Sequence, residues 1–306
     1  MKVVITGATS FLGVALCKAF QEAGHEVSAV CRASSGGLEN LPKGVRVVHA
    51  ELDEYAELPH SIPTADLFLH LAWAGTGHDG RDDVQVQKAN VRCALQAMQA
   101  AHEMGCRLFV MAGSQAEYGS TDQPQEEEMV CMPFSEYGKA KLSVYETGAE
   151  LAEQLGMKYL HLRIFSLFGE NDHPWTLVMS CVDKMLRNEP IDLSSCAQNW
   201  NFLYVHDAAR QIVRLCAYAT GQEHFGQRIY NIASENSRPL KDFVERMKEL
   251  TKSKSELHFG AIHPAHIVSL QPDISRLSKA IGMPVAPTDF DIVIQRIIDT
   301  HNDKTI

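Results

Sequence analysis

The segment EYGKAK places a tyrosine and a lysine, Tyr137 and Lys141, four residues apart. In a helix, residues at this spacing lie on one face. An ammonium group beside a phenol favours the phenolate, so we expect Lys141 to lower the pKa of Tyr137 toward neutrality. Such a tyrosine exchanges a proton with an alcohol oxygen while hydride leaves or reaches the adjoining carbon. The pair therefore indicates oxidoreductase chemistry at a hydroxyl-bearing or keto carbon.

A serine upstream fits the same chemistry. The apolar segment RLFVMA, residues 107–112, is typical of a buried strand, and Ser114 follows its end. There its hydroxyl would hold the substrate oxygen in place. Tyrosine–lysine pairs at this spacing also occur by chance on amphipathic helices, and a serine after a strand is usually a turn residue. Their order behind a glycine-rich loop is what gives them weight.

That loop is TGATSFLG, residues 6–13, between a predicted strand (2–6) and a predicted helix. In this context backbone N–H groups and the helix dipole can hold a pyrophosphate. Gly7 would allow the tight turn, and Gly13 would permit close packing of helix and strand. Ser10 stands where another glycine is usual, and its hydroxyl can donate to a phosphate oxygen. The loop predicts a dinucleotide site.

The end of the second predicted strand bears on the choice of dinucleotide. NAD sites commonly place an acidic residue there, whereas an arginine accommodates the 2′-phosphate of NADP. The segment VCRASSGG contains Arg32 and Ser34, with no carboxylate before Glu39. It favours NADP(H), with NAD(H) as the alternative.

Predicted strands and helices alternate along the N-terminal half, and they must position the glycine-rich loop, Ser114, Tyr137 and Lys141. Predicted helices begin after residue 10 and cover about 83–104 and 136–155, and continuous apolar strands are predicted at 2–6, 26–32, 45–49, 66–72, 107–112 and 158–165. This pattern predicts a parallel sheet covered on both faces, with ligands at the carboxyl ends of the strands. The fold class is therefore α/β, a Rossmann-like doubly wound parallel sheet.

The second half indicates a smaller, mainly helical C-terminal substrate lobe. A helix is predicted at about 174–188 and a strand at 228–234. We expect residues 1–165 plus about 203–232 to form the NAD(P)-binding domain. Residues of about 166–202 plus 233–306 would form the substrate-binding lobe.

Composition limits the partners. A net charge of −10 over 306 residues argues against nucleic-acid and membrane binding, which need a basic face. No signal peptide or membrane-length apolar run is evident, so we expect a cytoplasmic protein.

QEEEM, residues 125–129, is predicted to be a solvated acidic loop. No metal site is expected, because cysteines lack CxxC pairing and four histidines near apolar segments lack a second ligand: His70, His102, His161 and His206.

Together the motifs resemble the extended short-chain dehydrogenase/reductase superfamily, and within it the NAD(P)-dependent epimerase/dehydratase family that acts on sugar nucleotides. The resemblance covers nearly the whole chain. TGATSFLG is similar to TGxxGxxG, HLAWAG to an HLAA-like segment, GSQAEYG to SSxxVYG, EYGKAK to YGxSK, LRIFSLFGE to LRxxNVYGP, FLYVHDAA to DFVYVDDVA, and YNIAS to YNVGS.

The resemblance implies roles position by position. Ser114, Tyr137 and Lys141 would be catalytic, and Lys141 would also hold the nicotinamide ribose. Of the remaining cofactor-binding residues, the resemblance places Gly7, Ser10, Phe11 and Leu12 at the pyrophosphate, Glu51 and Leu52 at the adenine, Ala72 and Trp73 at the nicotinamide, and Asn90 in the following helix. Gly13, where helix and strand pack, and Arg32 and Ser34, after the second strand, complete the predicted cofactor site. The substrate side would hold Gln115, Phe165, Ser166, Trp200 and Asn201. Relatives often dimerise through the two long helices, so a homodimer is expected.

Three departures from the family pattern concern the substrate. Gln115 and Ala116 replace the Asp-Glu pair of the dehydratases, which disfavours a 4,6-dehydratase. Trp200 and Asn201 stand where an arginine often contacts the sugar-nucleotide diphosphate, and Ser166 replaces an asparagine. These departures predict that the substrate subsite differs from that of the family. They also leave open the possibility that the substrate carries no nucleotide.

Three functions fit these residues. The leading one is NADPH-dependent reduction of a nucleotide sugar, typically at C4 of a 4-keto-6-deoxy sugar, with Tyr137 protonating the oxygen. The alternative is a nucleotide-sugar 4-epimerase that retains NAD. A non-catalytic NADP-sensing regulator is less favoured, because both Tyr137 and Lys141 are present.

Overall fold

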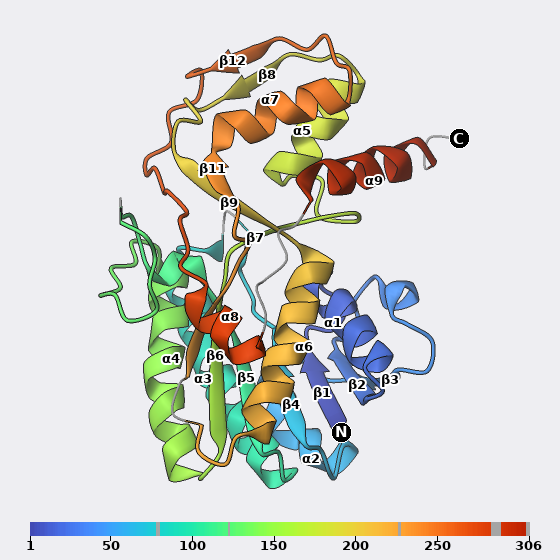
Figure 1. The fold of residues 1–306 in the computed structure, drawn as a ribbon. Coiled ribbons are helices and arrows are strands. Elements are labelled where there is room, and N and C mark those ends of the chain that lie inside the picture. The colour runs from blue at the N-terminus through green and yellow to red at the C-terminus, as the bar shows by residue number, and fades with distance from the viewer. Residues whose placement is uncertain (78–79, 122, 226–227, 283–288, 304–306) are drawn as a thin grey trace.

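The computed structural model describes residues 1–77, 80–121, 123–225, 228–282 and 289–303 (Figure 1). Its centre is a parallel sheet of seven strands in the order β10-β6-β5-β4-β1-β2-β3. The strands are β1 (Lys2–Thr6), β2 (Glu26–Cys31), β3 (Arg46–His49), β4 (Leu67–His70), β5 (Leu108–Ser114), β6 (Lys158–Ile164) and β10 (Ile229–Ile232). The chain reverses its direction of strand addition between β1 and β4, which is the switch point where Rossmann folds bind ligands. The predicted fold class is confirmed.

Helices cover both faces of this sheet, as Figure 1 shows. They are α1 (Phe11–Glu22) and α6 (Val205–Gly221) on one face, and α3 (Val84–Glu103) and α4 (Glu136–Gln154) on the other. Along β4, Leu67 and Leu69 belong to the core under α1 and α6, whereas Phe68 belongs to the core under α3 and α4. Because both faces are buried, the strands are continuously apolar.

Side-chain caps fix where the two long helices begin. The carboxylate of Asp83 accepts hydrogen bonds from the first-turn amides of Gln85 and Val86 at the start of α3. The hydroxyl of Ser135 accepts from the amide of Gly138 at the start of α4. Such caps satisfy N–H groups that have no partner within the helix. The cap of α4 places Tyr137 in the first turn of that helix.

A smaller part of the chain lies beyond the carboxyl ends of the large sheet (Figure 1). It contains two small sheets, formed by β7 (Ser166–Phe168), β9 (Asn199–Tyr204) and β11 (Ser237–Pro239), and by β8 (Ile191–Leu193) and β12 (Leu257–Phe259). Its helices are α5 (Leu177–Leu186), α7 (Leu240–Leu250) and α9 (Phe290–Asp303). Most of these strands have three residues, which is too short for hydrophobic periodicity to predict.

The short helix α8 (Ser275–Ile281) differs from the predicted division of the chain. The prediction places it in the substrate lobe, but it packs against α6 and β10 of the large sheet. A second short helix, α2 (Leu58–Ser61), follows β3. Residues 283–288 and 304–306 of the predicted lobe lie outside the described residues. The two-domain boundaries themselves stay a prediction.

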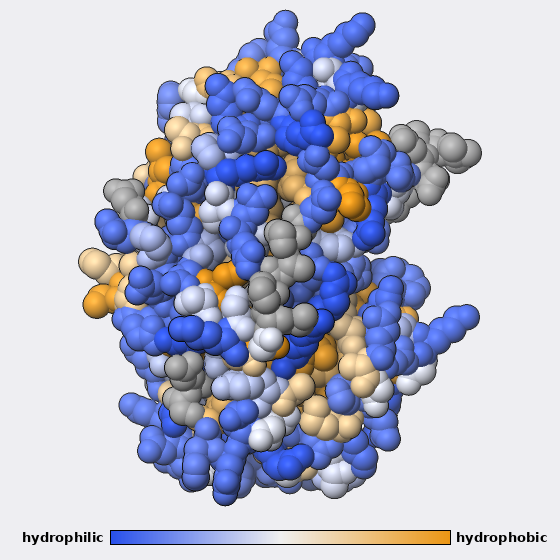
Figure 2. All heavy atoms as spheres, viewed as in Figure 1, coloured by the Kyte–Doolittle hydropathy of each residue, from blue (hydrophilic) through white to orange (hydrophobic). Residues whose placement is uncertain are grey.

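The face of the molecule drawn in Figure 2 is mostly hydrophilic. In Figure 2, hydrophobic residues form only small scattered groups on the face shown. A hollow of about 740 Å³ lies between α1, α6 and α9, with charged side chains such as Lys18, Glu22, Arg210 and Arg296 along it. Among the described helices, none combines the length and the apolar character needed to cross a membrane.

The segment at residues 125–129 is not the solvated acidic loop that its composition predicts. Gln125 is 1% exposed and Glu127 is 5% exposed. The Gln125 side chain donates to the carbonyl of Ser269 and accepts from the amide of Gln271. The Glu127 carboxylate accepts from the amide of Asn231 at 3.1 Å. Gln125 and Glu127 therefore point inward and bind backbone groups. Composition alone does not reveal this role.

Candidate active site

The glycine-rich loop after β1 has a shape that only glycine permits. Gly7 has φ = +65°, and a Cβ atom there would lie 2.9 Å from the backbone nitrogen of Ala72. A Cβ atom at Gly13 would lie 2.3 Å from the carbonyl oxygen of Gly7. Ser10 caps α1 by accepting a hydrogen bond from the amide of Gly13 at 3.1 Å. The loop and the start of α1, where Phe11 and Leu12 lie, form a cradle that fits a pyrophosphate.

The residues predicted near the ribose and adenine follow the next two strands. Arg32 and Ser34 are exposed in the loop after β2. In the same loop, a Cβ atom at Gly37 would lie 3.8 Å from the carbonyl oxygen of Thr9, so the loop lies beside the glycine-rich turn. Glu51 caps the 3₁₀ helix Leu52–Glu57 after β3. All of these groups are at the carboxyl edge of the sheet.

The three residues predicted to be catalytic line one cavity of about 290 Å³. Ser114 ends β5, and Tyr137 and Lys141 lie on successive turns of α4. Six other predicted site residues share the cavity with them: Ser10, Leu12, Trp73, Gln115, Phe165 and Ser166. Cofactor-loop residues and substrate-side residues thus meet at one hollow above the carboxyl ends of the strands.

Close packing of α4 against the end of β5 brings Ser114 and Tyr137 together. A Cβ atom at Gly138 would lie 2.5 Å from the carbonyl oxygen of Ala116, so a larger residue would force the helix away. The Ser114 hydroxyl oxygen accepts from the amide of Ala116 at 3.1 Å and is a hydrogen-bond partner of the Tyr137 phenol. The two hydroxyl groups can therefore contact one substrate oxygen.

Lys141 is buried and is held by neutral groups. Its ammonium donates to the carbonyl of Ala112 at 2.7 Å and lies 3.6 Å from the centre of the Trp73 ring. Burial lowers the pKa of Lys141 to about 7, against the opposing effect of Glu117. The charged form of Lys141 is therefore much less favoured than that of an exposed lysine.

The pKa of Tyr137 departs in the direction opposite to the prediction. Burial raises it, and the hydrogen bond with Ser114 and the charge of Arg81 only partly offset that effect. The expected lowering by Lys141 is wrong for this structure, because the ammonium is directed at Ala112 and Trp73 and lies 5.7 Å from the centre of the Tyr137 ring.

Arg81 is a site residue that sequence reasoning missed. It lines the cavity, and its guanidinium carbon lies 4.2 Å from the centre of the Tyr137 ring. Its carbonyl accepts a hydrogen bond from the amide of Tyr137 at 2.8 Å. Arg81 precedes α3 in an irregular segment without periodicity, so nothing in the local pattern indicates its position. Thr76, earlier in the same segment, was missed for the same reason.

Some predicted binding residues instead have structural contacts. The amide of Asn90 bonds both the N–H and the carbonyl of Ala74 at 2.9 Å, so it holds the loop after β4. The amide of Asn201 is fully buried and bonds the backbone of Ser234 on both sides. Trp200 lies on β9 beside Arg238 of β11. Neither Trp200 nor Asn201 lines the cavity, so direct substrate contacts are not expected from them.

A buried ionic network lies behind Ser114. The Glu117 carboxylate accepts from the amide of Ser114 at 2.7 Å and from Arg163 at 2.8 Å, and it pairs with His161 at 2.9 Å. His161 also contacts the hydroxyl of Tyr159 at 3.0 Å. Burial works to raise the pKa of Glu117, but His161 and Arg163 hold it below its ordinary value. The network fixes the turn that carries Ser114.

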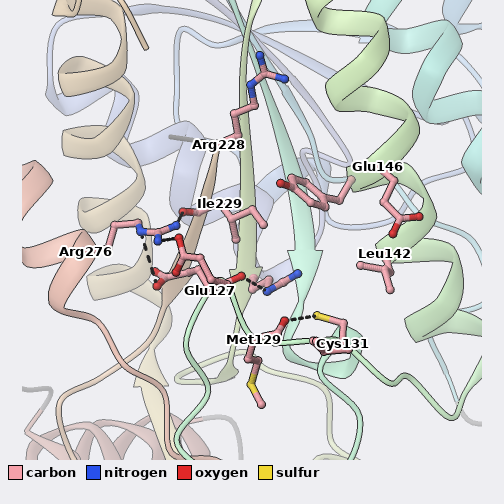
Figure 3. A pocket seen from close by; sticks show the side chains of 12 residues that line it. Glu127, Met129, Cys131, Leu142, Glu146, Arg228, Ile229 and Arg276 are labelled. Atoms are coloured by element: carbon pink, nitrogen blue, oxygen red, sulfur yellow. Dashed lines mark hydrogen bonds and ion pairs between the residues drawn. The ribbon is translucent and has the colours of Figure 1, made fainter. Parts of the chain in front are cut away.

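A second cavity, of about 510 Å³, lies against the outer edge of the large sheet (Figure 3). Arg276 forms ion pairs there with Glu127 and Glu128. Figure 3 shows Arg228 extending away from this group. Because its central charges neutralise one another, this cavity is less suited to binding or proton transfer than the cavity at Tyr137.

The histidines predicted to be structural have varied surroundings. His70 and His161 are fully buried, and His70 bonds the hydroxyl of Thr6 at 3.0 Å. His102 is exposed in the last turn of α3, and His206 is half-buried on α6. Within the described ranges, no three or more His, Cys, Asp or Glu side chains are grouped so that they could hold a metal ion.

Comparison with known proteins gives concordant matches. The family model described as the NAD-dependent epimerase/dehydratase family matches residues 3–233. A UDP-glucose 4-epimerase of Corynebacterium glutamicum is 24% identical over 96% of this chain and 94% of its own length. A CDP-abequose synthase of Salmonella muenchen is 20% identical over 85% of this chain and 84% of its own.

Solved structures share the fold. The UDP-glucose 4-epimerase of Thermotoga maritima, determined with UDP-glucose, superimposes with a TM-score of 0.88 at 19% identity, over the full length of both chains. The UDP-glucose 4-epimerase of Thermus thermophilus, in complex with NAD, gives a TM-score of 0.84 at 19% identity, over 99% of each chain.

Proposed function

Because the chain belongs to the NAD-dependent epimerase/dehydratase family, we propose that it moves hydride between NAD(P) and a hydroxyl-bearing or keto carbon of a nucleotide-activated sugar. One observation carries the proposal. Ser114, Tyr137 and Lys141 line a single cavity that also includes Ser10 and Leu12 of the glycine-rich loop. A proton-transfer group and a dinucleotide cradle are thereby adjacent.

Each group of site residues has a separate role in the proposed reaction. A bound nicotinamide supplies or accepts the hydride. The turn at Gly7 and the first turn of α1 hold the pyrophosphate, and Lys141 is placed to contact the nicotinamide ribose. Tyr137 takes the proton from the sugar hydroxyl during oxidation and returns it to the keto oxygen during reduction. Ser114 hydrogen-bonds the same oxygen and keeps it near Tyr137.

The first candidate reaction is 4-epimerisation with retained NAD. Several of the similar proteins are named as 4-epimerases of UDP-sugars, including the Corynebacterium glutamicum relative. Oxidation and re-reduction of one carbon need the same three residues and no net oxidant. Gln115 and Ala116 follow Ser114, and neither can transfer the additional proton that dehydration requires.

The second candidate is reduction of a 4-keto sugar by exchangeable NADPH. The observation that favours it is the exposed Arg32 directly after β2, beside the glycine-rich turn, where NADP sites use arginine. No carboxylate precedes Glu39 in that loop. A 4-keto-6-deoxy sugar nucleotide is the substrate type that this reaction would take.

Nucleotide content and substrate turnover distinguish the two reactions. Mass spectrometry of nucleotide released from the purified protein identifies NAD or NADP. UDP-glucose is then incubated with the protein and followed by NMR for UDP-galactose, while a 4-keto-6-deoxy nucleotide sugar is incubated with NADPH and followed by absorbance. Retained NAD and interconversion of the UDP-sugars support the epimerase. NADPH oxidation that depends on the keto sugar supports the reductase instead.

A sensor without catalysis is the remaining alternative. If Tyr137→Phe left the biological activity unchanged while the nucleotide still bound, proton transfer would not be the function.

We also propose a cytoplasmic homodimer formed by α3 and α4, which pack side by side at one face of the sheet. Light scattering of the purified protein measures its mass in solution and tests the dimer.

A further inference from the structure

Arg81 has a fixed relation to Tyr137 that the family pattern does not predict. The amide of Tyr137 donates to the carbonyl of Arg81 at 2.8 Å. The residue before Tyr137 and the residue after Arg81 also bond, because the amide of Glu136 donates to the carboxylate of Asp82 at 3.2 Å. Two hydrogen bonds therefore join the segment before α3 to the first turn of α4. The guanidinium carbon of Arg81 lies 4.2 Å from the centre of the phenol ring.

The charged groups that face Tyr137 come from three elements. Arg81 lies in the segment before α3, Lys141 lies on α4 itself, and Glu117 lies in the 3₁₀ turn after β5. Glu117 is negative and opposes the phenolate, but its charge is committed to His161 and Arg163. Burial disfavours the phenolate, and the hydrogen bond with Ser114 and the charge of Arg81 oppose that effect. Arg81 and Lys141 are the cations described near the ring.

These two cations are not equivalent. The ammonium of Lys141 is fully buried, donates to a neutral carbonyl and is partly deprotonated near pH 7. The guanidinium of Arg81 is half-exposed. Arginine side chains in general carry a permanent positive charge in proteins. The Arg81 guanidinium also lies closer to the centre of the phenol ring, at 4.2 Å against 5.7 Å for the ammonium.

We propose that Arg81 is a positioning residue for proton transfer, because its guanidinium against the phenol ring supplies the permanent positive charge that stabilises the phenolate of Tyr137. This inference rests on the proposed function of Tyr137 as the proton-transfer group. In this arrangement Lys141 mainly orients ribose and substrate, and Arg81 keeps the tyrosine competent to accept a proton when Lys141 is neutral. A cation over an aromatic face is an established favourable contact.

A different role for Arg81 would be recognition of an anionic part of the substrate, since it also lines the cavity. The two roles make different predictions. A cation that acts on Tyr137 changes the pH at which the tyrosine titrates, even without substrate. A cation that only binds substrate changes KM and leaves that titration alone.

The test is the titration of Tyr137 in the full-length protein, measured as the tyrosinate absorbance that Tyr137→Phe removes. The comparison is made in the wild type, Arg81→Gln, Arg81→Lys and Lys139→Gln. Lys139 is the matched control, because it is a cation on the same helix that pairs with Glu136. We expect Arg81→Gln to raise the titration midpoint by about one pH unit, and Arg81→Lys and Lys139→Gln to change it by much less.

The pH dependence of turnover gives the second readout. In the oxidation direction, where Tyr137 accepts the proton, the acid limb of kcat for Arg81→Gln should move to higher pH, so that activity at neutral pH falls about tenfold. An unchanged tyrosine titration in Arg81→Gln overturns the proposal, and so does a rise in KM alone. A shift in Arg81→Lys as large as in Arg81→Gln also contradicts it. If no nucleotide sugar is turned over, the proposed function fails, but the titration still decides the role of Arg81.

Discussion

Two buried charge clusters lie on either side of Ser114, and they are built on opposite principles. Behind it, Glu117 is bonded to His161 and Arg163, and every charge has a partner. In front of it, Tyr137 and Lys141 border a cavity, and the contacts described for the Lys141 ammonium are with neutral groups, namely the carbonyl of Ala112 and the rings of Trp73 and Tyr137. The first cluster satisfies its charges, and the second leaves a charge incompletely compensated.

The difference is the one expected between a cluster that stabilises the fold and a cluster that performs chemistry. A paired carboxylate with a lowered pKa favours the folded state, because the folded protein binds its proton less readily than the unfolded chain does. Its contribution is present above the pKa of the unfolded carboxylate and is lost as pH falls through the folded value. A lysine whose pKa is lowered to about 7 has the opposite effect, because its charged form is disfavoured in the folded protein. Displaced pKa values in a cavity are typical of functional sites.

The largest expected effect comes from Tyr137→Phe. It removes the proton-transfer oxygen, so we expect kcat to fall by about 10³-fold, or ~4 kcal/mol of transition-state stabilisation. The cluster behind Ser114 is untouched, so thermal stability should change little. Activity and the melting temperature are measured on the same preparation. Activity within tenfold of the wild type would remove the distinction between the two clusters.

Glu117→Gln is expected to have the largest effect on stability. It leaves the buried Arg163 without its carboxylate, and the loss of one partner of a buried pair costs about 3 kcal/mol or more. Chemical denaturation measures the free energy of unfolding. The control is Asp183→Asn at the exposed pair with Arg187, where roughly half a kcal/mol or less is expected. Equal losses in the two variants would show that the buried network has no special role.

Lys141→Met should affect stability in the opposite direction. Removing a buried ammonium that is paired only with neutral groups should stabilise the protein by roughly 2 kcal/mol below pH 7, while activity falls. The unfolded lysine titrates near 10.5 and the folded one near 7, so wild-type stability gains from this group as pH rises between those values. Denaturation at about pH 6 and about pH 9 should show that the advantage of Lys141→Met shrinks as pH rises. A variant that is less stable at both pH values would contradict this interpretation.

Much of the large sheet was predictable, because continuous apolar strands and amphipathic helices produce strong periodicity. The segment at 158–165 is such a strand, and the structure places β6 there. The meeting of Ser114 with Tyr137 also followed from the motif order, since a helix that follows a parallel strand begins at the edge of the sheet where that strand ends.

The missed features depend on contacts between distant residues. Arg81 approaches Tyr137 through two hydrogen bonds between the segment before α3 and the first turn of α4, and no local pattern indicates such contacts. The inward side chain of Glu127 binds Asn231, more than a hundred residues away. The direction of the Tyr137 pKa was missed because the sequence gives neither the burial that raises it nor the direction of the Lys141 ammonium, which is toward Ala112 and Trp73.

Ser10→Gly is expected to have the smallest effect, and it extends the comparison to the cofactor end of the cavity. The Ser10 hydroxyl caps α1 through the amide of Gly13. Glycine is itself an acceptable helix cap, and replacing serine by glycine there costs only a few tenths of a kcal/mol. Affinity for NAD(P), measured by calorimetry, should therefore stay within about tenfold, or ~1.4 kcal/mol. A much larger loss would mean that the Ser10 hydroxyl itself binds phosphate, and that this end of the cavity, like Tyr137, depends on one side-chain oxygen.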